Sequence, residues 1–500
     1  MSHPLTFALF AWTLDHCFLC SEEVKKKGFL LSLKVVVSWL HGQEGSPMWN
    51  LIGSLQSLVA LLQPAFTQPS FTTSCRLLLA WVMCLGKHTL QRVGDNSHPQ
   101  NPPDHSQRHG LDTYYNFFER AAWTPQSLAH QVSVLILTRL RLVGAITLLV
   151  DDTLAHKRGK SVWGLGWFRD AVASTKKRVA TASGHNWVVL AVAVCLPFTN
   201  VPILALPLLA RLHLPGKGQP SCADLAKEML AEVLGWWPGR RFILVGDGAY
   251  ATEGLLRNLD ERVSFVGRMR GDAAVYDPCV PRTKKSRRGP KAKKGARLPK
   301  PKEAAAKADR KRTTSGAWAW KEVSVLVYGC RRSLRALAYE VVWPRVLGYR
   351  RLRVVVVRDP SGRMRDAYLF TTDLGASLSW VITQFAWRWS IEVLFRASKQ
   401  VLDIEAPQQW SRESVEKVAP WVWSMQSVVM VWYITAGYQS KEAAELRGRL
   451  GDWDSEWSLR HMMQVLRQAI LDTTINPNSA DEAELREMTK TLKNWANLAA

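Results

Sequence analysis

The chain has 500 residues, which is too many for a single ordinary core and predicts roughly two to four domains. Its 66 Lys and Arg against 42 Asp and Glu give a net charge of +24, and this excess predicts a polyanionic partner, most simply nucleic acid. The 8 Cys are scattered, which excludes a disulfide-stapled scaffold and indicates a reduced, intracellular location. Only Cys17 and Cys20 have the spacing of a metal-ligand pair, and no second pair follows, so no zinc site is expected.

The first 140 residues are predicted to form a helical region. From residue 53 to residue 141 apolar residues recur with helical spacing, as in "SCRLLLAWVMCLGKHTLQRV", and a polar loop with Pro and His interrupts them at residues 94–110. The N-terminus lacks the basic segment and the small-residue cleavage site of a signal peptide.

The uncharged stretch from Asn186 to Ala210 is long enough to cross a bilayer. It contains three prolines, and β-branched residues surround the sequence "PFTN". This pattern fits two buried strands joined by a turn better than a continuous helix. We therefore expect no membrane span there.

Residues 141–410 change to an α/β pattern. The apolar runs "AITLLVDDT" and "RRFILVGDGAY" each predict a strand that ends in a carboxylate, and "PSCADLAKEMLAEVLGWW" between them predicts a helix. This order of elements is typical of an α/β core. We assign residues 141–255 and 366–410 to the core, 256–365 to a β-rich insertion, and 411–500 to a helical C-terminal region.

A strongly basic segment lies inside the insertion. Residues 282–312 contain 15 Lys and Arg, 2 acidic residues and no hydrophobic pattern, which predicts a loosely held loop. The strand-like segments on both sides favour a loop that reaches toward phosphates over a solvated run of charge. The candidate DNA contacts in it are Lys284, Lys285, Arg287, Arg288, Lys291, Lys293 and Lys294.

Three carboxylates occupy positions from which they could converge. Asp151 ends the first strand, Asp247 follows the second strand after one Gly, and Glu392 lies on the helix after a third strand, "DAYLF". Oxygen donors without neighbouring His or Cys suit Mg²⁺ or Mn²⁺, and two such ions can clamp the attacking and leaving oxygens of a phosphoryl transfer. An Asp at the end of a strand is by itself ordinary. Together with the basic charge, the set gives the hypothesis of phosphoryl transfer on nucleic acid.

The stretch "FAWRWSIEVLFRASKQ", residues 385–400, predicts an amphipathic helix. At about 100° per residue, one side of this helix carries Phe385, Arg388, Glu392 and Lys399 within an arc of roughly 60°. The opposite face is predicted to pack on the core; it consists of Trp387, Ser390, Leu394, Ala397 and Val401. By itself, the polar side indicates a solvated face with an Arg–Glu pair.

The motifs "LLVDDT", "ILVGDGAY" and "FAWRWSIEVLFRASKQVLDIE" resemble the three signatures of DDE transposases of bacterial cut-and-paste insertion sequences. The similarity is to the subgroup with a Tyr-x2-Arg-x3-Glu-x6-Lys signature, and it covers about residues 146–405. Phe385, Arg388, Glu392 and Lys399 hold the four positions, with Phe in place of Tyr. The resemblance implies an RNase H-like core interrupted by a β-rich insertion.

The resemblance also implies roles for individual residues. Asp151, Asp247 and Glu392 would hold two Mg²⁺ ions, for which Mn²⁺ could substitute. The residues that would lie against DNA are Phe385, Arg388, Arg396 and Lys399. Asp152 is the alternative to Asp151, because successive strand residues point to opposite faces and only one of the two can be a ligand. Asp151 is preferred since it fits the family's Asp-x-Thr/Ser pattern.

We therefore expect a DNA transposase that cuts double-stranded DNA at the element's inverted repeats and joins the freed 3′-OH to target DNA. It would act as a homodimer in the cytoplasm, at the nucleoid, with residues 1–140 binding the element's ends. Two alternatives stay open: a metal-dependent nuclease without strand transfer, and a non-catalytic DNA-binding protein descended from a transposase. The intact set of three carboxylates argues against the second.

Overall fold

The computed structural model describes residues 52–95, 108–175, 177–196, 203–278, 293–311, 318–327, 330–449 and 455–474. Cys17, Cys20 and the "PFTN" turn lie outside these ranges, as does most of the basic segment.

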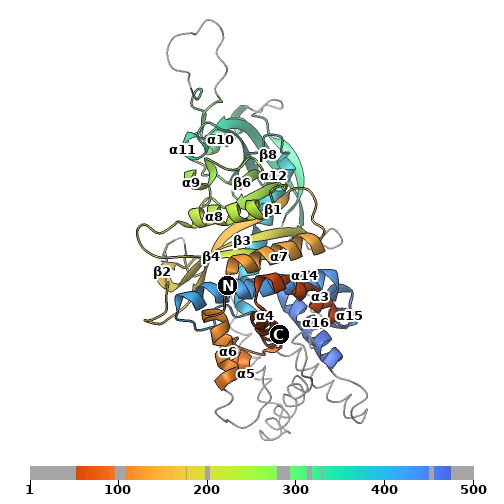
Figure 1. The fold of residues 1–500 in the computed structure, drawn as a ribbon. Helices are drawn as coiled ribbons and strands as arrows, with labels where there is room; N and C mark the ends of the chain where they lie inside the picture. Colours follow the sequence, from red (N-terminus) through yellow and green to blue (C-terminus); the bar gives the residue numbers. More distant parts are fainter. Residues whose placement is uncertain are drawn as a thin grey trace.

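A ten-stranded mixed sheet runs through the molecule (Figure 1). Its strands are β1 (Ile146–His156), β2 (Gly166–Arg169), β3 (Thr181–Cys195), β4 (Ile203–His213), β5 (Phe242–Gly246), β6 (Val263–Arg268), β7 (Lys321–Val327), β8 (Cys330–Val342), β9 (Arg351–Arg358) and β10 (Ala367–Thr371). Their order is β2-β3-β1-β5-β6-β10-β9-β8-β7, and β4 also pairs with β3. The predicted α/β class is therefore confirmed.

The core of this sheet has antiparallel and parallel halves. Strands β1, β3 and β4 are antiparallel neighbours, whereas β1, β5 and β6 run parallel. The five residues of β5 are all buried, as are the first five of β1. Such continuous apolar runs are typical of strands covered on both faces. The arrangement is the mixed sheet expected of an RNase H-like core.

The uncharged stretch from Asn186 to Ala210 forms parts of β3 and β4, which pair from Asn186↔His213 to Cys195↔Ile203. The predicted pair of buried strands is confirmed. Among the described helices, none has both the length and the apolar character that crossing a membrane requires.

The insertion extends the core sheet. Strand β10 pairs antiparallel with β6, and β9, β8 and β7 follow in order. Strand β6 (residues 263–268), which follows the predicted boundary at residue 255, pairs parallel with β5. A six-residue strand carries no signal of which neighbour it pairs with, so the sequence pattern could not place β6 beside β5.

Helices cover both faces of the sheet. They are α3 (Gly53–Val59), η1 (Ala60–Ala65), α4 (Gln68–Met83), α5 (Leu90–Asp95), α6 (Arg108–Glu119), α7 (Pro125–Arg139), α8 (Cys222–Trp236), α9 (Glu253–Leu256), α10 (Pro301–Lys311), α11 (Pro344–Leu347), α12 (Leu378–Trp387), α13 (Trp389–Gln400), α14 (Arg412–Thr435), η3 (Gly437–Gln439), α15 (Lys441–Arg447) and α16 (Leu459–Thr474). Helices α3 to α6 and α14 to α16 gather in the lower part of the molecule in Figure 1, whereas α8 to α12 lie in its upper part. Helix α14 is buried on nearly every side and packs on β4, α7 and α16. It therefore joins the N-terminal helices to the sheet.

Helix α10 corrects one prediction. Residues 282–312 were expected to form a loosely held loop, but Pro301–Lys311 is helical. Ala304, Ala305 and Ala308 are buried at helical spacing, and Asp309 pairs with Arg358 of β9 at 2.7 Å. A stripe of Ala is too small a hydrophobic signal to stand out among so many charges, although Ala has the highest helix propensity.

Gly184 of β3 provides a test of the packing between β3 and β1. A Cβ at this position would lie 2.3 Å from the backbone oxygen of Ala155, so Gly184→Ala must displace a strand. We expect a loss of about 1–3 kcal/mol and a lower thermal midpoint. Gly235→Ala in α8, where a Cβ meets open space, is the control and should leave the midpoint unchanged or raise it. Equal midpoints for the two variants would contradict this packing.

Candidate active site

Parallel pairing of β1 and β5 brings two of the predicted carboxylates together, although Asp151 does not end its strand as predicted, because β1 continues to His156 paired with β3. Val150 lies opposite Gly246, so Asp151 and Asp247 follow at equivalent positions. Adjacent strands are about 4.8 Å apart, which places the two carboxylates beside each other. The Asp247 carboxylate accepts a hydrogen bond of 2.7 Å from the N–H of Ala249, which holds it at the start of the following turn.

Asp151 and Asp152 point to opposite faces. Asp152 accepts hydrogen bonds from the hydroxyl of Tyr250 (3.2 Å) and the amide of Asn186 (3.3 Å), on the side covered by α8. Asp151 faces the other side, where α13 packs on β1. The geometry thus brings Asp151, the residue preferred from the sequence, and not Asp152, to the side of Glu392.

The guanidinium of Arg388 bridges Asp151 and Glu392. One terminal nitrogen lies 2.6 Å from the Asp151 carboxylate, and the other lies 2.7 Å from the Glu392 carboxylate. The Arg388 and Asp151 side chains are only 17% and 16% exposed, so solvent screens this contact little. Burial by itself lowers the pKa of Arg388, but the charges of Asp151 and Glu392 outweigh it and raise the pKa overall.

Arg388 stands at a break between two helices. A single helix over residues 385–400 was predicted, but α12 ends at Trp387 and α13 begins at Trp389. The N–H of Arg388 donates to the carbonyl of Phe385, and the N–H of Ile391 donates to the carbonyl of Arg388, both three residues back. Sequence periodicity cannot show such a break, because it reports only which face is apolar. The break separates Phe385 from the helix that carries Glu392.

A second tie fixes the end of α12. Gln384 is buried and accepts a hydrogen bond of 3.0 Å from the hydroxyl of Thr147 on β1. This contact lies one turn before Arg388 and four residues before Asp151. It fixes the position of the end of α12 relative to β1, and therefore the position of the Arg388 backbone.

The predicted core-packed face is confirmed in part, because Trp387, Ala397 and Val401 are partly buried and pack against the core, but other residues of α13 are more deeply buried. Its buried residues are Ile391, Leu394, Phe395 and Ser398. Of the predicted apolar face only Leu394 is among them. The other members, Trp387, Ser390, Ala397 and Val401, line an open groove of about 470 Å³ together with the exposed side chains of Trp389 and Val393.

Burial dominates the electrostatics of Asp151. It raises the pKa of this carboxyl to about 7, against the opposing charge of Arg388 and with help from the neighbouring charges of Asp247 and Asp152. Near neutral pH, the buried carboxylate therefore depends on a cationic partner to stay ionised.

The donor chemistry of Asp151, Asp247 and Glu392 fits a hard divalent cation, since all the donors are carboxylate oxygens. Within the part of the chain that the structure describes, however, no three His, Cys, Asp or Glu side chains are close enough together to hold an ion. The Arg388 guanidinium lies between Asp151 and Glu392 instead.

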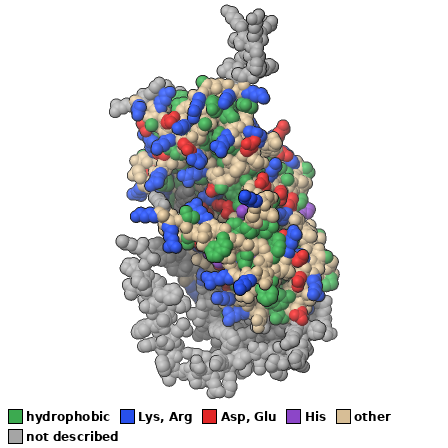
Figure 2. Space-filling view, turned by 90° about the vertical axis from the view of Figure 1, so that its left-hand side faces the viewer, with side chains coloured by type: hydrophobic (Ala, Val, Ile, Leu, Met, Phe, Trp, Pro, Cys, Tyr) green, Lys and Arg blue, Asp and Glu red, His purple; other side chains and the backbone are tan. Residues whose placement is uncertain are grey.

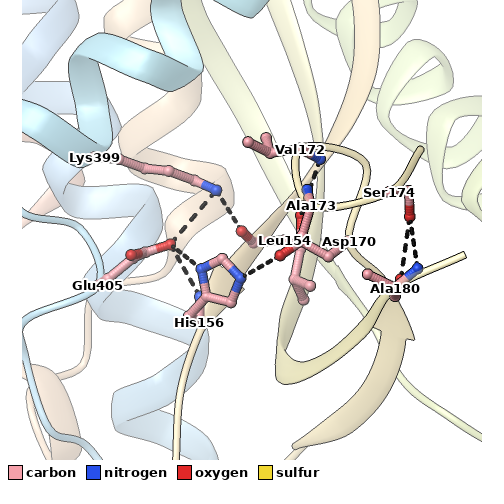
Figure 3. A network of polar contacts seen from close by, with 9 residues as sticks. All are labelled: Leu154, His156, Asp170, Val172, Ala173, Ser174, Ala180, Lys399 and Glu405. Carbon is pink, nitrogen blue, oxygen red and sulfur yellow. Dashed lines mark hydrogen bonds and ion pairs between the residues drawn. The ribbon is translucent and has the colours of Figure 1, made fainter. Parts of the chain in front are cut away.

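Lys399 belongs to a polar network at the end of β1 (Figure 3). Its ammonium contacts the backbone oxygen of Leu154 and lies 3.4 Å from the Glu405 carboxylate. His156 lies between Glu405 (3.3 Å) and Asp170 (2.9 Å). Lys399 is thus held by the Leu154 backbone oxygen and the Glu405 carboxylate.

The sequence pattern did not reveal this network. Glu405 closes the motif "VLDIE" on which the resemblance partly rests, but nothing there assigned it a role. His156 and Asp170 carried no signal, because their meeting depends on the turn that leads into β2. Lys157 secures the same corner by donating to the backbone oxygens of Glu405 and Pro407, at 2.7 and 2.6 Å.

The remaining predicted DNA contacts are spread over the molecule. Phe385 is half-buried, with its ring centre 5.8 Å from the Arg388 guanidinium, and Arg396 is exposed. Lys293 and Lys294 are exposed and lie over the rings of Tyr349 and Tyr276. Lys284, Lys285, Arg287, Arg288 and Lys291 lie outside the described residues.

Residues 62–329, more than half of the chain, match the family described as DDE superfamily endonuclease. The protein belongs to this family. The matched range includes Asp151 and Asp247 and ends before Glu392. Among curated proteins, none matches the chain.

One solved structure similar to this endonuclease is entitled "Cryo-EM structure of piggyBac transposase synaptic complex with hairpin DNA (SNHP)". The two sequences are 11% identical, the alignment covers 93% of this chain and 84% of that one, and the TM-score is 0.35.

The pKa of Asp151 predicts how its contribution to stability depends on pH. A pKa raised from 3.8 to about 7 means that folding favours the protonated carboxyl, so the contribution is full below about pH 4 and is lost as the pH rises through 7. The quantity to measure, in chelator, is the difference in unfolding free energy between wild type and Asp151→Asn. This difference should fall by on the order of 1–4 kcal/mol between about pH 4 and about pH 8. Urea unfolding at several pH values measures it.

Asp272→Asn is the matched control for this measurement. Asp272 is exposed, and its hydrogen bond with Arg270 lowers its pKa. The difference in unfolding free energy between wild type and Asp272→Asn should therefore shrink only in acid. A flat difference for Asp151→Asn across the same pH range would contradict the raised pKa.

Proposed function

We propose that this endonuclease is a DNA transposase of a bacterial cut-and-paste insertion sequence, of the subgroup with the Tyr-Arg-Glu-Lys signature. The observation that supports it best is the arrangement of the three carboxylates: Arg388 joins Asp151 to Glu392, and Asp247 follows β5 beside Asp151. Asp151 and Glu392, which are 241 positions apart (392 − 151), share one guanidinium.

In this proposal, Asp151, Asp247 and Glu392 hold divalent ions, Mg²⁺ or Mn²⁺. When bound, the ions supply charge neutralisation and an activated water or 3′-OH for in-line phosphoryl transfer. The chain's own contribution is positioning: the parallel strands fix the two Asp side by side, and the Thr147–Gln384 bond sets the end of α12. Lys399, seven residues after Glu392 on α13, contacts the backbone oxygen of Leu154, three residues after Asp151 on β1. There it would add a positive charge for a phosphate at that end of the site.

The proposed DNA surface includes the insertion. Figure 2 shows Lys and Arg side chains spread over the upper part of one face, which the insertion forms, with Asp and Glu among them. Exposed arginines alternate with buried residues along β8: Arg331, Ser333 and Arg335 face outward, and Leu334 and Ala336 face inward. Such a face can contact the phosphates of double-stranded DNA without reading its sequence.

The proposal includes a homodimer that holds two DNA ends, with the N-terminal helical region on the inverted repeats, acting at the nucleoid in the cytoplasm. A nuclease without strand transfer is the second candidate, since the same carboxylates would serve it. The two differ in the fate of the 3′-OH: a transposase joins it to target DNA, whereas a nuclease leaves it free.

An excision assay on a plasmid with the gene's own flanking DNA tests the proposal. Glu392→Gln should lower cleavage in Mg²⁺ at least about 100-fold, because it removes one metal ligand, and should not weaken DNA binding measured in chelator. Glu228→Gln, an exposed residue of α8, is the control and should cleave like wild type. Wild type should bind DNA in Ca²⁺ without cutting it.

The outcomes of this assay separate the candidates. Strand-transfer products support the transposase, and cleaved ends that are never joined support the nuclease. Tight binding without cleavage by wild type would show a non-catalytic DNA-binding protein. Undiminished cleavage by Glu392→Gln would place the active site elsewhere.

Lys293 and Lys294 test the surface of the insertion. Replacing both with Gln should weaken binding to any duplex and reduce the slope of log K against log salt by roughly 1 for each phosphate that is no longer neutralised. Fluorescence anisotropy over a series of salt concentrations measures it. Lys441→Gln, exposed on α15, is the control. An unchanged slope for the double variant would remove these lysines from the interface.

A further inference from the structure

The Arg388 guanidinium occupies the space between two of the three carboxylates that the proposed function assigns to metal. Its contacts of 2.6 Å with Asp151 and 2.7 Å with Glu392 are short, charge-assisted hydrogen bonds. A cation between these two oxygens is therefore already present in the free protein. A divalent ion bound by both carboxylates needs the same lone pairs.

The arginine is incompletely satisfied where it lies. Its Nε–H is buried and has no hydrogen-bond partner in the described structure. A buried donor without a partner is unfavourable, so part of the gain from the two carboxylates is offset. Arg388 is the single residue between α12 and α13, so it is not part of a continuous helix.

We propose, on the basis of the proposed function, that Arg388 is an internal substitute for the metal ion and that the ion and Arg388 exchange places. In the free protein the guanidinium neutralises Asp151 and Glu392. When an ion binds these carboxylates, the guanidinium is released and takes a DNA phosphate as its new anionic partner.

This exchange couples metal binding to DNA binding. Without DNA, an ion must displace a buried cation that then has no anionic partner, so its affinity is low. With DNA present, the phosphate receives the guanidinium and the ion binds more tightly. By linkage, the ion strengthens DNA binding by the same factor. The protein therefore assembles a loaded metal site chiefly on DNA, which limits unproductive cleavage chemistry.

Mn²⁺ titrations followed by electron paramagnetic resonance of the free ion test the exchange, with and without a short blunt duplex. For wild type, the duplex should tighten Mn²⁺ binding about 10-fold or more. Arg388→Gln should tighten Mn²⁺ binding by a similar factor without DNA, and the duplex should then add little. Arg388→Lys, which keeps the charge but cannot bridge both carboxylates, should lie in between and serves if the Gln variant does not fold.

The matched control is Arg412→Gln, which breaks another Arg–Glu pair four residues apart, on α14, at 3.4 Å. It should bind Mn²⁺ like wild type. Equal or weaker Mn²⁺ binding by Arg388→Gln would overturn the exchange and show that the arginine organises the carboxylates for the ion. If Glu392→Gln leaves Mn²⁺ binding unchanged as well, the metal site itself, and with it the proposed function, fails.

Discussion

The parallel pairing of β1 with β5 is the constraint on which the candidate site depends. Both strands are covered on both faces, so their continuously buried runs exclude charged side chains, and charge can enter only where these runs end. Asp151 and Asp247 stand at that point in equivalent register. Two carboxylates held side by side repel each other, and burial adds to this penalty. The consequence is a need for positive charge at this edge.

Arg388 meets that need from within the chain. Its guanidinium joins a carboxylate on a strand to another on a helix, although the two lie on opposite sides of the long insertion. Arg388 lies at the residue that separates α12 from α13. Here α12 runs across the strands of the insertion and the core, whereas α13 packs on β1 and β4.

Helix α12 links the insertion to the candidate site, because it contacts strands of the insertion and ends next to Arg388. The insertion's strands β7, β8 and β9 continue the core sheet beyond β10, and α12 contacts β7 and β9 as well as β5, β6 and β10. On the other side of the site, Glu405 and His156 tie Lys399 to the end of β1 and to the loop after α13.

The sequence by itself determined the α/β class, the paired strands of the uncharged stretch, the helices described within residues 53–139 and 412–474, and the carboxylates worth following. These depend on local patterns: apolar runs, prolines, and the spacing of charged residues along one helix. The resemblance to DDE transposases was readable from three short motifs, and the family match to DDE superfamily endonucleases agrees with it.

Only the tertiary structure decided how these pieces meet. The choice between Asp151 and Asp152 as the side chain that faces Glu392 depends on which helix covers which face. The Arg388 bridge and the His156–Glu405–Lys399 network join residues far apart in the chain. The helix in the basic segment and the membership of β6 in the core sheet depend on packing partners. A linear pattern records which side of an element is apolar, but not what that side packs against.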